Sequence, residues 1–199
     1  MKKNTAAWAS DLARKHLETP LPRRWAHTQG VARQARTLAL ILGDKADLLE
    51  AAAWLHDIGY APDLVDTGFH PLDGARYLRD THHTDAHLCR LVAHHSCASI
   101  EARERDLEQI LIREFDARPP KLADWLLYCD MTTSPVGKSV TVEDRLSEIL
   151  SRYGAGHIVA KSIANSANIL IDTTNRLKEI VKFSTEKHSV CYRSNSSFE

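Results

Sequence analysis

The sequence predicts an all-α fold. Leu, Ala and charged residues dominate, and apolar residues recur at steps of three and four, the period of an amphipathic helix. Alternating β-branched runs of the kind that form strands are absent apart from a short stretch at 139–142. With 199 residues, 43% of them hydrophobic, the chain can bury one sizeable core without disulfides or other cross-links. We therefore predict a single helical domain.

Proline and glycine residues mark the predicted helix ends. Pro22 and Pro119–Pro120 favour helix starts, whereas Gly43 and Gly59 favour helix ends. Together with the apolar periodicity, these signals predict helices over residues 5–18, 23–42, 45–58, 71–80, 84–96, 101–115, 119–131, 142–152 and 156–182.

The C-terminal part of the chain is predicted to add helices over 141–182 to the domain. Thr141 and Asp144 resemble a capping box at the start of this part. Beyond residue 182 the sequence is polar and has no periodic pattern, so we predict a disordered tail over 183–199. The predicted domain is therefore 1–182.

The overall composition excludes several classes of protein. The chain has 26 basic and 26 acidic residues, a net charge of zero that argues against a partner such as a nucleic-acid polymer. No apolar stretch reaches the length of a membrane span, and the N-terminus lacks the apolar core of a signal peptide. The four cysteines form no CxxC pair, which is typical of reduced thiols. We therefore predict a cytoplasmic protein.

The unusual feature is histidine, because the chain has eleven. In several predicted helices, continuing the apolar stripe by three, four or seven residues reaches an imidazole or a carboxylate near one helix end. The residues reached in this way are His27, His56, Asp57, His94, His95 and Asp130.

Such a set of inward-facing polar residues predicts a metal site. Burying a carboxylate costs several kcal/mol unless a cation or hydrogen-bond donors compensate it. A divalent metal between helices satisfies several of these groups at once. Mixed imidazole and carboxylate ligands suit Fe, Mn, Zn, Co or Ni without distinguishing among them. The absence of thiolates from the set argues against a closed structural zinc site.

The motifs around these residues resemble the HD-domain superfamily of metal-dependent phosphohydrolases, of the HDIG type. The resemblance covers about 23–135, as the HD core of the domain, and lies in the segments RRWAHTQGVARQA, AAAWLHDIGY, FHPLDGARYLR, LVAHHS and ADWLLYCD, in this order. Two departures stand out. Tyr60 follows HDIG where many relatives have Lys, and no Gly-Tyr-Pro motif follows the paired histidines.

The resemblance implies a set of metal ligands. His27, His56, Asp57 and Asp130 are similar to the ligands of a first ion, with Asp57 able to bridge to a second ion. His70 and His94 would complete the second site, and His95 is the competitor to His94 because the helix phase admits either. One or two divalent ions are expected, and Mg is also possible.

The resemblance also implies a reaction. Water activated by a divalent metal, with Asp57 as the central catalytic residue, would hydrolyse a phosphate monoester or anhydride of a small, possibly nucleotide, substrate. His95 is a candidate proton donor to the leaving group. Arg24, Thr133 and Lys138 are the candidate substrate-binding residues.

Two alternatives remain open. The first is a di-iron oxygenase, since some members of the superfamily use the six-ligand site to activate oxygen. The second is a non-catalytic regulator that binds a metal or a nucleotide.

Overall fold

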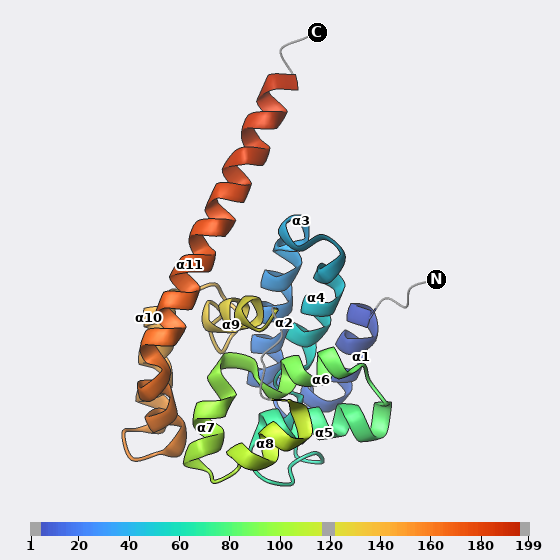
Figure 1. Ribbon diagram of the computed structural model, residues 1–199, viewed down its shortest axis with the longest axis vertical. Helices are drawn as coiled ribbons and strands as arrows, with labels where there is room; N and C mark the ends of the chain where they lie inside the picture. Colours follow the sequence, from blue (N-terminus) through green and yellow to red (C-terminus); the bar gives the residue numbers. More distant parts are fainter. Residues whose placement is uncertain (1–4, 117–121, 196–199) are drawn as a thin grey trace.

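The fold is a bundle of α-helices, as predicted. The structure is a computed structural model and describes residues 5–116 and 122–195 (Figure 1). Within these ranges the only extended pairing is one isolated bridge between Thr133 and Ser139. The α-helices are α1 (Thr5–Leu17), α2 (Pro22–Thr37), α3 (Ala39–Leu42), α4 (Ala46–Leu55), α5 (His70–His82), α6 (Ala86–Ala93), α7 (Ala98–Glu104), α8 (Glu108–Phe115), α9 (Ala123–Met131), α10 (Val142–Tyr153) and α11 (Ile158–Asn195).

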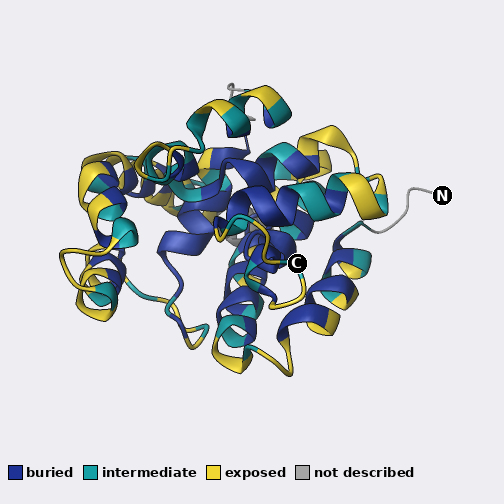
Figure 2. Cartoon of the chain, turned by 90° about the horizontal axis from the view of Figure 1, so that it is seen from below, coloured by how far each residue is buried: buried dark blue, intermediate teal, exposed yellow. Residues whose placement is uncertain are grey.

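Helix α4 lies at the centre of the main core. Its Leu49, Ala51–Ala53 and Leu55 are fully buried, and α1 and α2 pack against it. Figure 2 shows the buried residues concentrated in the middle of the bundle and the exposed residues on its outer faces. The small side chains of Ala51–Ala53 let the neighbouring helices approach closely, which brings polar residues at the ends of α2 and α4 near one another.

A second, smaller core holds α10 and α11 against α9. It contains Leu127 and Met131 from α9, Leu146 and Ile149 from α10, and Leu170 from α11. The apolar residues of α10 lie three and four positions apart, so they form one stripe along the helix. The C-terminal helices therefore cover the side of the domain where α9 ends.

Several helices end earlier than the sequence predicts. The predicted helices 45–58 and 84–96 stop at Leu55 and Ala93, and short 3-10 turns η2 (Ile58–Tyr60) and η3 (His95–Cys97) follow. Ser96 and Cys97 adopt positive φ angles of 47° and 62°, which an α-helix does not tolerate. The residues that follow Ala93 therefore leave the regular helical phase.

The C-terminal tail differs from the prediction. The last helix continues through residue 182 to Asn195, and Figure 1 shows α11 extending away from the body of the domain. The sequence from 183 to 195 is polar but contains neither Gly nor Pro, so nothing in it breaks the helix. Residues 196–199 of the predicted tail, and the Pro119–Pro120 helix start, lie outside the described residues.

No helix among the described residues combines the length and apolar character that crossing a lipid bilayer requires.

Candidate metal centre

The first group of candidate ligands joins α2 to the end of α9. His27 Nδ1 donates a hydrogen bond to Ser134 O at 3.1 Å, so in the neutral ring Nε2 carries the free lone pair. This Nε2 lies 3.0 Å from Asp130 Oδ1, and both side chains are buried. An imidazole lone pair and a carboxylate oxygen therefore face each other inside the protein.

His56 completes this group from the end of α4. Its Nδ1 donates to Ala53 O at 2.8 Å, which again leaves the Nε2 lone pair facing the cluster. His56 Nε2 lies 3.3 Å from Asp57 Oδ2 but is buried without a hydrogen-bond partner. Single ligand atoms of His27, His56 and Asp130 all lie within 4.8 Å of one another.

A second group lies next to the first and contains Asp57, His70 and His95. Asp57 Oδ1 lies 3.4 Å from His70 Nε2 and 4.0 Å from His95 Nε2, and the two ring nitrogens are 3.1 Å apart. His95 Nδ1 donates to Val92 O at 2.7 Å, so the His95 Nε2 lone pair faces this group. Because Asp57 Oδ2 faces His56, the Asp57 carboxylate connects both groups.

The choice of His94 over His95 as a ligand requires correction. His94 Nε2 lies 3.1 Å from Phe115 O and donates to it, so this side chain is turned toward α8 and away from the cluster. The physical reason is the end of α6 at Ala93, after which the chain turns through η3 and brings His95 inward.

The two groups fit a cationic metal better than protons alone. Without a metal, two lone pairs that face each other need a proton between them, as at the contact of His70 Nε2 with His95 Nε2. Protonating these rings would place several buried imidazolium ions side by side, which is costly. Burial lowers the pKa values of His70 and His95, which opposes protonation of these two rings, whereas the nearby Asp57 raises the pKa of His56 against the effect of burial. A divalent ion in each group would satisfy the facing lone pairs, including the unpartnered His56 Nε2.

The two aspartates are held in the charged form that binds metals. Burial by itself would raise the pKa of Asp57, but the positive charge of Arg24, which donates to this carboxylate, holds that pKa well below its ordinary value. Burial also acts to raise the pKa of Asp130, and the neighbouring His27 and His56 side chains hold it below its ordinary value. Both carboxylates are therefore ionised at neutral pH.

Arg24 is placed beside the cluster, as the sequence predicts. Its Nη1 donates to Asp57 Oδ2 at 2.7 Å, and its guanidinium lies 3.9 Å from the centre of the Tyr60 ring. Tyr60 in turn stacks on His70 with ring centres 3.9 Å apart. The residue that stands where many relatives have Lys therefore orients both a candidate ligand and a candidate phosphate-binding arginine.

Thr133 and Lys138 are not brought to the cluster. The Thr133 hydroxyl is buried and donates to Cys129 O at 2.7 Å, so it satisfies a carbonyl at the end of α9. Lys138 is exposed and lines neither cavity next to the candidate ligands. We therefore do not retain these two residues as substrate-binding residues.

Ser96 is a cluster residue that the sequence analysis missed. Its hydroxyl donates a short hydrogen bond to Asp130 Oδ2, the oxygen that does not face His27. Ser96 reaches this position only because its φ of 47° turns the chain between His95 and Cys97. A periodic pattern cannot reveal such a residue, since it lies in a turn.

Gly59, in the HDIG sequence, permits the close approach of α5. A Cβ atom at this position would lie 2.1 Å from the carbonyl oxygen of His70, closer than any normal contact. We expect Gly59→Ala to lower the free energy of unfolding by about 1–3 kcal/mol, because the backbone that carries His70 must move. Urea unfolding of this variant measures the loss.

Gly156→Ala is the matched control, since a Cβ there meets nothing within 4 Å. Its stability should change by less than about 0.5 kcal/mol. Equal stability of the Gly59 variant and the wild type would contradict the close packing described above.

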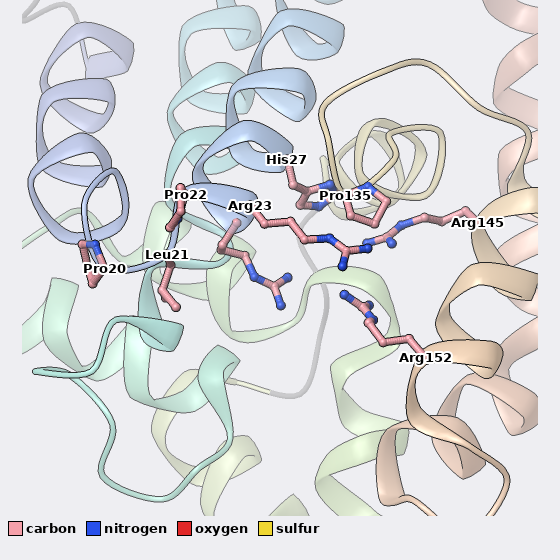
Figure 3. A pocket seen from close by; sticks show the side chains of 9 residues that line it. Pro20, Leu21, Pro22, Arg23, His27, Pro135, Arg145 and Arg152 are labelled. Atoms are coloured by element: carbon pink, nitrogen blue, oxygen red, sulfur yellow. The ribbon is translucent and has the colours of Figure 1, made fainter.

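A cavity of about 290 Å³ opens beside His27 and Arg24. Figure 3 shows the guanidinium groups of Arg23, Arg145 and Arg152 pointing toward one another across it. Its remaining lining is apolar, from Pro20, Leu21, Pro22 and Pro135. The arginines of α10 were missed by the sequence analysis, although Arg145 and Arg152 are seven residues apart and so share one helix face.

Comparison with known families identifies the domain. Residues 24–118 match the family model of the HD domain. The matched region holds five of the six clustered ligand candidates, and Asp130 lies beyond it. Residues 24–118 of the chain therefore form an HD domain, a domain typical of metal-dependent phosphohydrolases.

A curated relative shares part of this region. Ribonuclease Y of Thermoanaerobacter pseudethanolicus (strain ATCC 33223 / 39E) is 33% identical over 91 residues, which make up 46% of this chain and 17% of that protein. The chain thus spans less than a fifth of the length of this relative. No solved structure matches the chain significantly.

Proposed function

We propose that the protein hydrolyses a phosphate monoester or anhydride of a small substrate and uses two divalent metal ions to do so. The observation that carries this proposal is the pair of adjacent donor groups, His27–His56–Asp130 and Asp57–His70–His95, with Asp57 connecting them. Six nitrogen and oxygen donors without a thiolate suit hydrolytic metals.

The carboxylate of Asp57 is the central element of this proposal. One oxygen faces each donor group, so Asp57 is placed to hold two ions at a fixed separation. Two divalent ions, when bound, activate a water molecule and stabilise both the attacking and the leaving oxygens of a phosphoryl group. The backbone carbonyls of Ala53 and Val92 fix the His56 and His95 rings so that Nε2 stays aimed at the ions.

Arg24 is proposed to bind the phosphoryl group. Its guanidinium contacts Asp57 and is still partly exposed, with 18% of the side chain accessible. Tyr60 covers one face of the guanidinium, and the in-plane N–H groups that do not contact Asp57 can donate hydrogen bonds to phosphate oxygens. His95 is proposed as a ligand in place of the proton-donor role predicted from the sequence, because its Nε2 faces His70.

The test is a panel of phosphate-release assays. The protein, loaded with Mn²⁺, Co²⁺, Ni²⁺, Mg²⁺ or Fe²⁺, is offered p-nitrophenyl phosphate, nucleotides and a short RNA. We expect phosphate release from a small substrate, lost on chelation and restored by metal. Oxygen consumption with bound iron and no phosphate release would instead favour the oxygenase alternative, and binding without turnover would favour the regulator.

A further inference from the structure

We propose that the arginine-lined cavity beside the metal centre binds a second phosphate group of the substrate. The inference rests on the proposed function and narrows the substrate to a compound with an organic group and at least two phosphates. Arg23, Arg145 and Arg152 are the residues assigned to the second phosphate.

The cavity adjoins the metal centre and shares lining residues with it. His27, a candidate ligand, and Arg24, the partner of Asp57, both line it. Arg24, Arg145 and Arg152 also line the smaller cavity that contains Asp57, His70 and His95. A ligand whose first phosphate lies at the metal centre can therefore extend directly between the arginines.

The cavity carries an excess of positive charge. Four arginines and no acidic residue line it. Glu148, which does not line the cavity, pairs with three of them, at 2.6 Å from Arg145, 3.2 Å from Arg23 and 3.5 Å from Arg152. One carboxylate cannot balance three guanidinium groups, and a cleft lined by one sign of charge attracts the opposite charge.

Arg145 is incompletely satisfied although it is buried. Only 5% of the residue is exposed, and its Nε is a buried donor without a hydrogen-bond partner. Buried guanidinium donors are costly when unpaired and are usually paired in folded proteins. Phosphate oxygens in the cavity would supply the missing acceptor and the missing negative charge together.

The rest of the lining fits the organic part of the substrate. Pro20, Leu21, Pro22 and Pro135 present rigid apolar surface next to the arginines. A small inorganic anion would leave this surface unused. An apolar ring joined to phosphate groups would contact both parts of the lining.

Binding of two probes that cannot be hydrolysed tests this inference. The probes are adenosine 5′-(α,β-methylene)diphosphate and the one-phosphonate adenosine analogue, measured by calorimetry with Mn²⁺ and, separately, with chelator. We expect the wild type to bind the first probe at least about tenfold more tightly in both buffers, as charged hydrogen bonds predict. Arg152→Gln and Arg23→Gln should each remove most of that preference.

Arg14→Gln is the matched control, because Arg14 lies on α1 and pairs only with the neighbouring Asp11 among the contacts described. This variant should keep the preference of the wild type. A wild type without preference, or a preference that survives in both cavity variants, would overturn the inference. If the proposed hydrolysis is wrong but this inference is right, the protein will release no phosphate. It will still bind the two-phosphate probe more tightly in chelator, and that preference will still depend on the arginines.

Discussion

Replacing Asp57 by asparagine is expected to reduce phosphate release by about a thousandfold or more, the scale seen when electrostatic stabilisation of a transition state is removed. The asparagine side chain is neutral and has one oxygen instead of two, so it cannot bind a cation at each end as the carboxylate can. We also expect the metal content of Asp57→Asn to fall. Phosphate release and metal content per chain are measured on the same preparation.

A control separates this effect from unfolding. Arg24 donates to Asp57, so the variant also loses a buried ion pair and some stability. Far-UV circular dichroism and thermal unfolding show whether the variant is folded under assay conditions. Asp124→Asn changes an exposed aspartate, 54% accessible, and should retain full activity. A folded Asp57→Asn protein with wild-type activity would contradict the proposed role.

The second large effect is the difference between two adjacent histidines. His95→Gln should lower phosphate release by about a hundredfold or more, because it removes a donor that faces His70 and Asp57. His94→Gln should keep activity within about threefold, since its lost hydrogen bond to Phe115 costs only about 1 kcal/mol of stability.

This pair is its own matched control, because both residues are buried histidines in the same turn. Kinetics and metal analysis of the two variants decide between the two positions. Activity that survives in His95→Gln and disappears in His94→Gln would contradict the geometry of η3.

The helical fold and most of the candidate site could be predicted from residue spacing. His27 and Asp130 continue the apolar stripes of α2 and α9 and lie in regular helix, so a step of four residues predicts that both side chains face inward. His56 and Asp57 follow directly after α4, close enough for the helical phase to hold. The HDIG sequence then supported the same residues independently.

The remaining features depend on contacts that spacing cannot reveal. Helix α6 ends at Ala93, so its periodicity does not show which of His94 and His95 faces the cluster. The turn with positive φ at Ser96 decides this, and the sequence does not reveal that turn. No motif in the sequence singles out Arg145 and Arg152, and only the packing of α10 against α9 and α11 brings them to the metal centre. The C-terminal helix continues to Asn195 because a polar composition without Gly or Pro does not by itself end a helix.

An anomalous difference map from crystals grown with Mn²⁺ tests the central claim most directly. The account predicts two peaks, one enclosed by His27, His56 and Asp130 and the other by His70 and His95, with Asp57 between them. A map without a peak at either group, in crystals whose soaking solution contains saturating Mn²⁺, would contradict the assignment of this cluster as a metal centre.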